Sequence, residues 1–308
     1  MPTNDPRPSK AARREDARAK ALALRQEQER KAKRTRLIAI AGLVTAVAVL
    51  GGVVFGIVRQ GQATRVAYED TAFGGGADLV VAPALADVEV PAVADETGGV
   101  PVSSAGVGEA GDDDVVLTVY FDFMCPWCGK FDAANSAELV ALAADEGVTV
   151  VYKSIAFLDR NSQNTFYSTR SANAAAVVAD EDPEHYVDFV TALFENQPEE
   201  GTKGLTDTEI GDIALGVGVP QDVVDRFTVT VDGTFEVATN DDGTETETRE
   251  GTWRTFAPFV AAATQQTATE LGGLSTPTVL IDGEKWEGDL YTTGPLTQAV
   301  LDAVAAKG

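Results

Sequence analysis

The sequence has few residues that bind soft metals, with two cysteines, one histidine and two methionines among its 308 residues. A structural zinc site needs four ligands, and Cys125, Cys128 and the distant His185 supply only three. The composition therefore predicts no metal site of this kind. A chaperone that binds Cu(I) through the two thiolates remains an alternative, although the chain has no methionine-rich stretch to support it.

Most of the chain also has little positive charge. Residues 1–36 carry twelve Lys/Arg against five Asp/Glu, a net charge of +7, whereas the remainder carries −31 of the total of −24. Binding to nucleic acid depends on Lys and Arg contacts to phosphate, so the acidic body argues against a nucleic-acid partner. The basic segment, residues 1–36, and the acidic remainder of the chain are therefore predicted to lie in two different environments.

One long hydrophobic run separates these two parts. Residues 37–58 contain no charged side chain and would span roughly 33 Å as a helix, which is enough for a bilayer core. A cleaved signal peptide is the alternative, but its apolar core is usually shorter, and Arg59-Gln60-Gly61 does not resemble a cleavage site. We expect a membrane anchor with residues 1–36 in the cytoplasm and the acidic body outside the cell membrane. Residues 59–98 are predicted to be a flexible linker with short strands at 79–81 and 88–93.

Both cysteines lie in one motif, Cys125-Pro126-Trp127-Cys128. The apolar run 115–121 predicts a buried strand before it, and residues 126–144 predict a helix after it. At a helix N-terminus, free N–H groups and the helix dipole stabilise a thiolate, so Cys125 is expected to be the reactive thiol. Pro126 suits the first helical position. A structural disulfide is the alternative, although so short a loop contributes little stability.

The rest of the folded domain, residues 99–308, predicts an α/β arrangement. A strand at 148–152 after the motif helix indicates a parallel β-α-β unit. Residues 232–251 are predicted to be an exposed acidic loop or hairpin, of no assigned role. The remaining predictions are a strand at 100–102, helices at 168–179, 183–196, 207–215, 221–227, 253–271 and 295–306, a strand within 274–283 and its partner at 285–290.

With the strands and helices in this order, the chain resembles the DsbA-like thiol–disulfide oxidoreductases of the thioredoxin superfamily, in their membrane-anchored bacterial form. Two motifs carry the resemblance, Cys125-Pro126-Trp127-Cys128 and Thr276-Pro277. The resemblance covers residues 99–308 and is most specific in the Phe121-x-Phe123-x-Cys-Pro-x-Cys block. It implies a central mixed sheet flanked by helices, with a helical insertion at about 160–270. It also implies that Thr276 and a cis Pro277 face the cysteines and bind the substrate chain.

The sequence departs from the pattern of this family at two positions. Trp127 stands where the best-known oxidants have histidine, and we expect it to contact substrate at the surface. Val119 occupies the position of a buried acid found in many thioredoxin-type sites. Asp122 is closer to the motif and is expected either to be an exposed residue or to influence the site. Lys130 and Lys153 are each expected to be solvated, with a lowered pKa of Cys125 as the alternative role.

The resemblance implies disulfide exchange on exported proteins, with the Cys125–Cys128 disulfide as the redox centre and no other cofactor. Disulfide formation is the favoured direction, and a reductase or isomerase is the alternative within the same class. A non-catalytic binding module with a structural disulfide is the alternative from a different class. The implied partners are cysteine-containing exported proteins and a membrane protein that regenerates the disulfide. The sequence does not specify the substrates, the redox partner or the oligomeric state.

Overall fold

The computed structural model describes Lys20, Lys31 and residues 71–73, 80–240 and 243–308. The chain divides into two units, residues 1–60 and 61–308, and the fold described below belongs to the second. No helix among the described residues is both long and apolar enough to cross a membrane. The predicted anchor, residues 37–58, lies outside the described residues, as does most of the predicted cytoplasmic segment.

The second unit is built on a six-stranded mixed sheet. In spatial order, its strands are β2 (Gly106–Val107), β1 (Val100–Ser103), β4 (Val148–Ser154), β3 (Val115–Phe121), β7 (Thr278–Ile281) and β8 (Glu284–Lys285). The central strands β3 and β4 are parallel, as predicted, whereas β7 runs antiparallel to β3. The expected thioredoxin-like α/β fold is therefore present.

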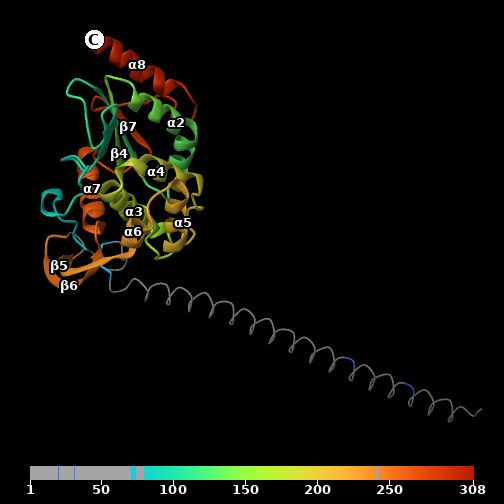
Figure 1. Ribbon diagram of the computed structural model, residues 1–308. Coiled ribbons are helices and arrows are strands. Elements are labelled where there is room, and N and C mark those ends of the chain that lie inside the picture. Colours follow the sequence, from blue (N-terminus) through green and yellow to red (C-terminus); the bar gives the residue numbers. More distant parts are fainter. Residues whose placement is uncertain (1–19, 21–30, 32–70, 74–79, 241–242) are drawn as a thin grey trace, which may run out of the picture. The chain divides into compact units, whose positions relative to one another are not determined.

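Successive side chains of β3 point to opposite faces of the sheet. Leu117, Val119 and Phe121 belong to the main hydrophobic core, on the side covered by α2 (Pro126–Ala144) and α8 (Pro295–Lys307). Tyr120 points to the opposite face, where it meets Glu270 at the end of α7 (Ala257–Glu270). Figure 1 shows α8 and α2 at one end of this unit, and the hairpin of β5 (Thr230–Ala238) and β6 (Thr246–Arg254) at the opposite end.

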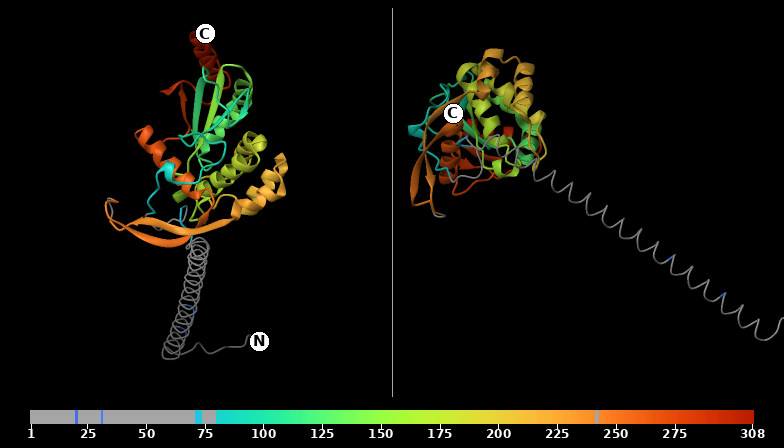
Figure 2. Two further views of the ribbon diagram at one scale, coloured as in Figure 1. Left: turned by 60° about the vertical axis from the view of Figure 1, so that its left-hand side comes forward. Right: turned by 90° about the horizontal axis from the view of Figure 1, so that it is seen from below.

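An insertion between β4 and β7 carries most of the helices. The acidic segment 232–251 lies in an exposed hairpin, as predicted, which extends away from the helices (Figure 2). One helix differs from its prediction, because α7 begins at Ala257 rather than at 253. Trp253 and Arg254 belong instead to the second hairpin strand, where regular pairing with the first satisfies their backbone. The insertion comprises α3 (Tyr167–Glu181), α4 (Tyr186–Glu195), α5 (Asp207–Val217), α6 (Gln221–Val224), β5 (Thr230–Ala238), β6 (Thr246–Arg254) and α7, with short 3-10 helices at Asp159–Asn161, Pro183–His185 and Asp225–Thr228.

A buried charge network joins the insertion's parts. The Asp207 carboxylate accepts hydrogen bonds from Arg170 of α3 at 2.8 Å and from Arg254 of β6 at 2.7 and 3.1 Å. Both guanidinium groups are buried, so this carboxylate offsets the cost of removing two positive charges from water. The arginines hold the pKa of Asp207 below its ordinary value against the opposing effect of burial.

The flexible linker was expected to extend to residue 98, but residues 80–98 pack on the domain. Val81 donates a backbone hydrogen bond to Glu236 of the hairpin, and Ala92 donates to the Asp180 carboxylate at 2.8 Å. Leu85–Asp87 form a 3-10 helix, and residues 88–93 form no strand, contrary to prediction. The hydrophobic side chains Leu85, Val88 and Val93 pack against the main core, which a composition rich in glycine, alanine and acid did not reveal.

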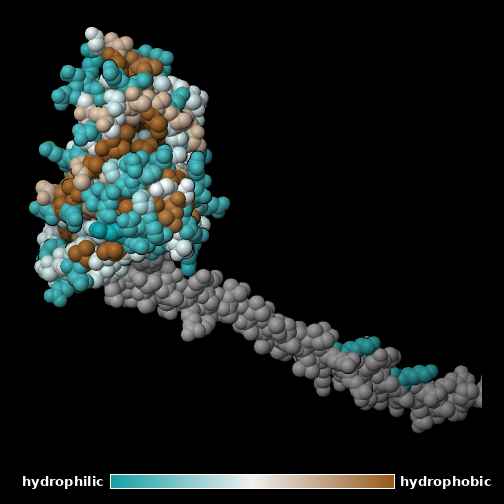
Figure 3. All heavy atoms as spheres, in the orientation of Figure 1, coloured by the Kyte–Doolittle hydropathy of each residue, from teal (hydrophilic) through white to brown (hydrophobic). Residues whose placement is uncertain are grey.

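The surface of this unit is mixed in polarity. Figure 3 shows hydrophilic side chains interspersed with smaller hydrophobic areas over the described part of one face. Such a pattern is ordinary for a domain in contact with water, because polar atoms alone do not cover a protein surface.

Candidate active site

The two cysteines lie where β3 leads into α2. Cys125 is the N-cap residue of the helix and is 5% exposed, whereas Cys128 lies in the first turn and is 1% exposed. Both are free thiols in this structure. Cys128 N–H donates to the carbonyl of Cys125 at 3.0 Å, and Cys125 N–H donates to that of Asp122 at 3.0 Å. The chain thus makes two consecutive turns that bring the motif to the end of the sheet.

The environments of the two thiols shift their pKa values in opposite directions. A hydrogen bond from Cys128, helped by Thr276 and the first backbone N–H groups of α2, lowers the pKa of Cys125 to about 6. Burial raises the pKa of Cys128 well above its ordinary value, and its hydrogen bond to Cys125 adds to this. The nearly complete burial of Cys128 disfavours its charged form and accounts for this rise. At neutral pH the pair therefore holds one thiolate and one thiol.

The loop before β7 supplies the facing wall of the site. The Thr276–Pro277 peptide bond is cis, as expected, and the thiol of Cys125 donates to the carbonyl of Thr276 at 3.4 Å. The structure thus brings Cys125, Thr276 and Pro277 together, although they are about 150 residues apart in sequence.

Two aromatic side chains form the exposed rim beside the cysteines. Trp127 is 51% exposed, which agrees with the expected surface position, and its ring centroid lies 5.4 Å from that of Tyr291. Lys130 is also exposed and places its ammonium 4.0 Å from the centre of the Trp127 ring. Burial and then the negative charge of Cys125 raise the pKa of Tyr291. Tyr291 reaches the site from the loop between β8 and α8, and no motif in the sequence pointed to it.

Asp122 is fully buried, so the expectation that it is an exposed residue is wrong. Its carboxylate accepts hydrogen bonds from Met124 N–H at 2.8 Å, Leu158 N–H at 3.0 Å and the Ser168 hydroxyl at 2.7 Å. Burial raises its pKa to about 7, against the opposing effect of these three donors. Asp122 therefore links the turn before Cys125 to the insertion.

Lys153 was expected to be solvated, but it is 4% exposed. Its ammonium pairs with the Glu270 carboxylate at 3.1 Å and lies 5.2 Å from the centre of the Tyr120 ring. This ion pair compensates the burial of the lysine on the face of the sheet opposite α2. Lys153 is thus a partner of α7, and no direct contact joins its ammonium to the thiols.

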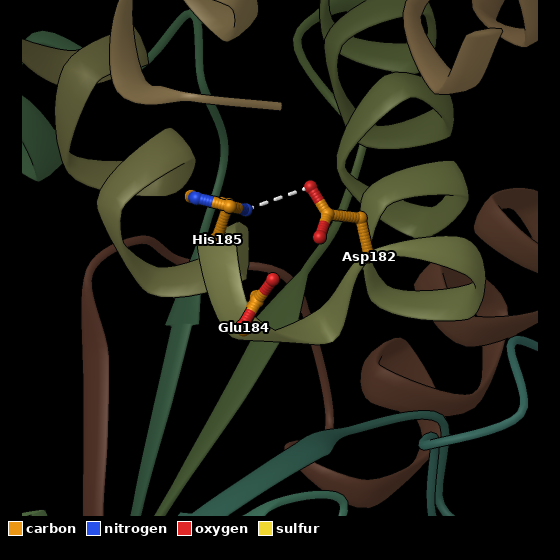
Figure 4. Close-up of side chains that lie close together, drawn as sticks. All are labelled: Asp182, Glu184 and His185. Atoms are coloured by element: carbon orange, nitrogen blue, oxygen red, sulfur yellow. Dashed lines mark hydrogen bonds and ion pairs between the residues drawn. The ribbon is translucent and has the colours of Figure 1, made fainter. Parts of the chain in front are cut away.

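His185 lies at the junction of α3 and α4, with Asp182 and Glu184 beside it (Figure 4). Its Nδ1 is 2.8 Å from the Asp182 carboxylate. These three side chains are the one group of potential metal ligands found among the described residues, and neither cysteine belongs to it. The geometry therefore does not combine His185 with Cys125 and Cys128 in a zinc site.

The rate at which iodoacetamide alkylates Cys125 in the reduced protein should rise with pH around a midpoint near 6, because only the thiolate reacts. Cys128→Ala removes the hydrogen bond that lowers this pKa most, so the midpoint should move upward. Cys128→Ser keeps an O–H donor and should move it less. A wild-type midpoint near the ordinary value of about 8.5 would contradict the asymmetry described above.

A protein-family model described as Thioredoxin matches residues 107–299, which include the whole site. Among curated proteins, the serine/threonine-protein kinase PknE of Mycobacterium tuberculosis is 34% identical over 106 residues, covering 33% of this chain and 19% of the kinase. The chain therefore spans about a fifth of that relative's length. This match concerns a segment of the kinase and carries no conclusion about kinase activity.

Two solved structures share the fold. The MdbA protein of Actinomyces oris, a thiol-disulfide oxidoreductase, superposes with a TM-score of 0.52 at 22% identity, covering 72% of this chain and 97% of that one. The MdbA protein of Corynebacterium diphtheriae, also a thiol-disulfide oxidoreductase, gives 0.51 at 18% identity, covering 74% and 98%. At these identities the likeness establishes the fold alone.

Proposed function

This chain belongs to the thioredoxin family, and from that premise we propose that it catalyses thiol–disulfide exchange through Cys125 and Cys128. The observation that carries the proposal is the asymmetry of the pair, with the pKa of Cys125 lowered to about 6 and that of the more deeply buried Cys128 raised. A structural disulfide needs no such difference. The MdbA proteins, which have the same fold, are named as thiol-disulfide oxidoreductases.

The proposed reaction has two steps. A substrate thiolate attacks Sγ of Cys125 in the Cys125–Cys128 disulfide, so a mixed disulfide forms and Cys128 leaves and takes up a proton. A second substrate thiolate then attacks the substrate sulfur of the mixed disulfide and releases Cys125 as a thiolate. The substrate loses two electrons and gains a disulfide, while the cysteine pair is reduced. The cysteine pair is itself the redox centre in this scheme.

The direction we propose is oxidation of the substrate. A lowered pKa makes Cys125 a good leaving group in the second step and stabilises the reduced pair at neutral pH. Cys128 does not oppose this effect, because a thiol with a raised pKa is protonated in both the folded and the unfolded protein at that pH. A stabilised dithiol corresponds to an oxidising disulfide. Reductase or isomerase activity is the alternative outcome of the test below.

The oxidised protein, added in stoichiometric amount, should restore activity to a reduced, unfolded test protein that requires disulfides, and should become reduced itself. Its reduction potential, measured by equilibration with glutathione, should lie above that of glutathione. A potential well below glutathione, with rapid reduction of insulin, would indicate a reductase instead. A pair that neither exchanges nor reduces readily would favour the alternative of a binding module with a structural disulfide.

We further propose that the domain acts outside the cell membrane on exported proteins containing cysteine, anchored by residues 37–58 and reoxidised by a membrane partner. The support is the sequence alone, in the uncharged run and the opposite charges on its two sides. Protease added to intact cells should digest residues 61–308 and leave a fragment containing residues 1–36 protected. Protection of the domain in cells whose outer layer admits the protease would reverse this orientation.

A further inference from the structure

Gln197 connects the insertion directly to the cysteine motif. It follows α4 and precedes Pro198, and its side chain is half-buried. The amide Nε2 donates to the carbonyl of Phe123 at 2.9 Å and to that of Cys125 at 2.8 Å. One side-chain amide thus spans the turn that leads from β3 into α2.

This contact occurs where the motif has no cap of its own. Cys125 is the N-cap residue of α2, and its side chain makes no capping hydrogen bond. Its carbonyl accepts from Cys128 N–H at 3.0 Å and from Gly129 N–H at 3.3 Å, which fixes the first turn of the helix. Cys128 N–H is also among the groups that lower the pKa of Cys125. A donor that holds this carbonyl therefore acts on the same turn that stabilises the thiolate.

The residue after the motif leaves room for Gln197. A Cβ added at Gly129 would lie 2.3 Å from Oε1 of Gln197, a distance at which one of them must move. Glycine inside a helix costs about 1 kcal/mol relative to alanine, so Gly129 makes α2 less stable than an alanine would. The space that it leaves is filled by the oxygen of the same amide whose nitrogen binds the Cys125 carbonyl.

We propose that Gln197, seated against Gly129, is a positioning residue that holds the Cys125 carbonyl and thereby keeps the Cys125 thiol in its reactive geometry. The insertion then takes part in the chemistry of the site rather than only covering it. This inference rests on the proposed function for its consequence in catalysis, whereas its effect on the thiol is measurable in the reduced protein alone.

Two substitutions of similar size separate hydrogen bonding from packing. Gln197→Met fills the space without a donor, and Gln197→Glu places a carboxylate beside the two carbonyls. Relative to the wild type, the alkylation midpoint of Cys125 should rise by roughly half a unit in Gln197→Met and by roughly one unit or more in Gln197→Glu, because the negative charge also opposes the thiolate. The reduction potential should fall in the same order, while thermal unfolding shows that both variants remain folded.

Gly129→Ala tests the same contact from the other side. It should improve the helix and yet raise the Cys125 midpoint by displacing Gln197, whereas Gly216→Ala, in α5 with open space around it, is the matched control and should leave the midpoint unchanged. In the double variant with Gln197→Met, Gly129→Ala should add little, since both remove one interaction. Unchanged midpoints in folded Gln197→Glu and Gly129→Ala would overturn the inference. Wild-type protein without exchange activity would instead overturn the proposed function, and the midpoints would still decide the role of Gln197.

Discussion

Cys128→Ala should accumulate mixed disulfides with other proteins, whereas Cys125→Ala should trap almost none. Cys125 has the lowered pKa and lies at the start of α2 beside the exposed Trp127, so a partner sulfur reaches it first. Cys128 is 1% exposed, and its raised pKa keeps it protonated in the reduced protein, so it does not attack partner sulfurs itself. In the reduced Cys128→Ala variant the Cys125 thiolate still attacks a partner disulfide, and without the Cys128 thiol the resulting mixed disulfide has no resolving group within the protein.

The two variants should be isolated after acid quenching and compared on non-reducing gels. We expect high-molecular-weight bands in Cys128→Ala that disappear on reduction, and at least about tenfold fewer in Cys125→Ala, in line with the effect of thiolate fraction on exchange rate. A double Cys125→Ala, Cys128→Ala variant gives the background. Equal trapping by both single variants would show that the two roles are not separated. Trapping by neither would favour the binding-module alternative.

The local parts of this site could be predicted from sequence because they depend on neighbours in the chain. The strand Val115–Phe121 and the helix Pro126–Ala144 have the predicted bounds, since an apolar run leads into Pro126 at a helix start. The cis bond before Pro277 was expected from the family resemblance. The contact between the Thr276–Pro277 loop and Cys125 was also expected from the family resemblance alone. No periodicity in the sequence relates positions so far apart.

The parts that were missed depend on tertiary contacts. Asp122 and Lys153 are charged residues whose partners, Ser168 and Glu270, lie 46 and 117 residues away, so their burial could not be inferred locally. Gln197 follows a helix at a position that the sequence marks only by the proline after it. The glycine at position 129, directly after the second cysteine in a helix, was the one local signal that another group approaches there.

The helix expected at 253–271 shows a second kind of limit. Trp253 and Arg254 have no strong preference against a helix, and the apolar residues that follow favour one. In the structure, these two residues pair with Thr230 and Val231, and Arg254 also binds the Asp207 carboxylate. The long pairing between the strands and the ion pair outweigh local propensity, which is worth only a fraction of a kcal/mol per residue.

Asp122→Ala should destabilise the domain by about 4 kcal/mol, because it leaves the Met124 N–H, the Leu158 N–H and the Ser168 hydroxyl without a partner in a fully buried place. Ser168→Ala removes only one of the three hydrogen bonds and should cost about 1 kcal/mol, so it serves as the matched control. Urea unfolding at several pH values measures both. A loss in Asp122→Ala no larger than that in Ser168→Ala would show that the carboxylate does not hold the turn.

The same measurement has a pH dependence of defined sign. Burial raises the pKa of Asp122 from 3.8 to about 7, so the folded protein binds this proton more tightly than the unfolded chain does. The contribution of Asp122 to stability is therefore greatest below pH 3.8 and is lost as pH rises to about 7, beyond which it stays constant. Asp132 and Asp159, whose pKa values burial also raises, act in the same direction in wild type and variant alike. Only the difference in free energy of unfolding between wild type and Asp122→Ala isolates Asp122, and this difference should shrink between pH 5 and pH 7. A difference that grows with pH would show that the three donors, rather than burial, determine the pKa of this carboxyl group.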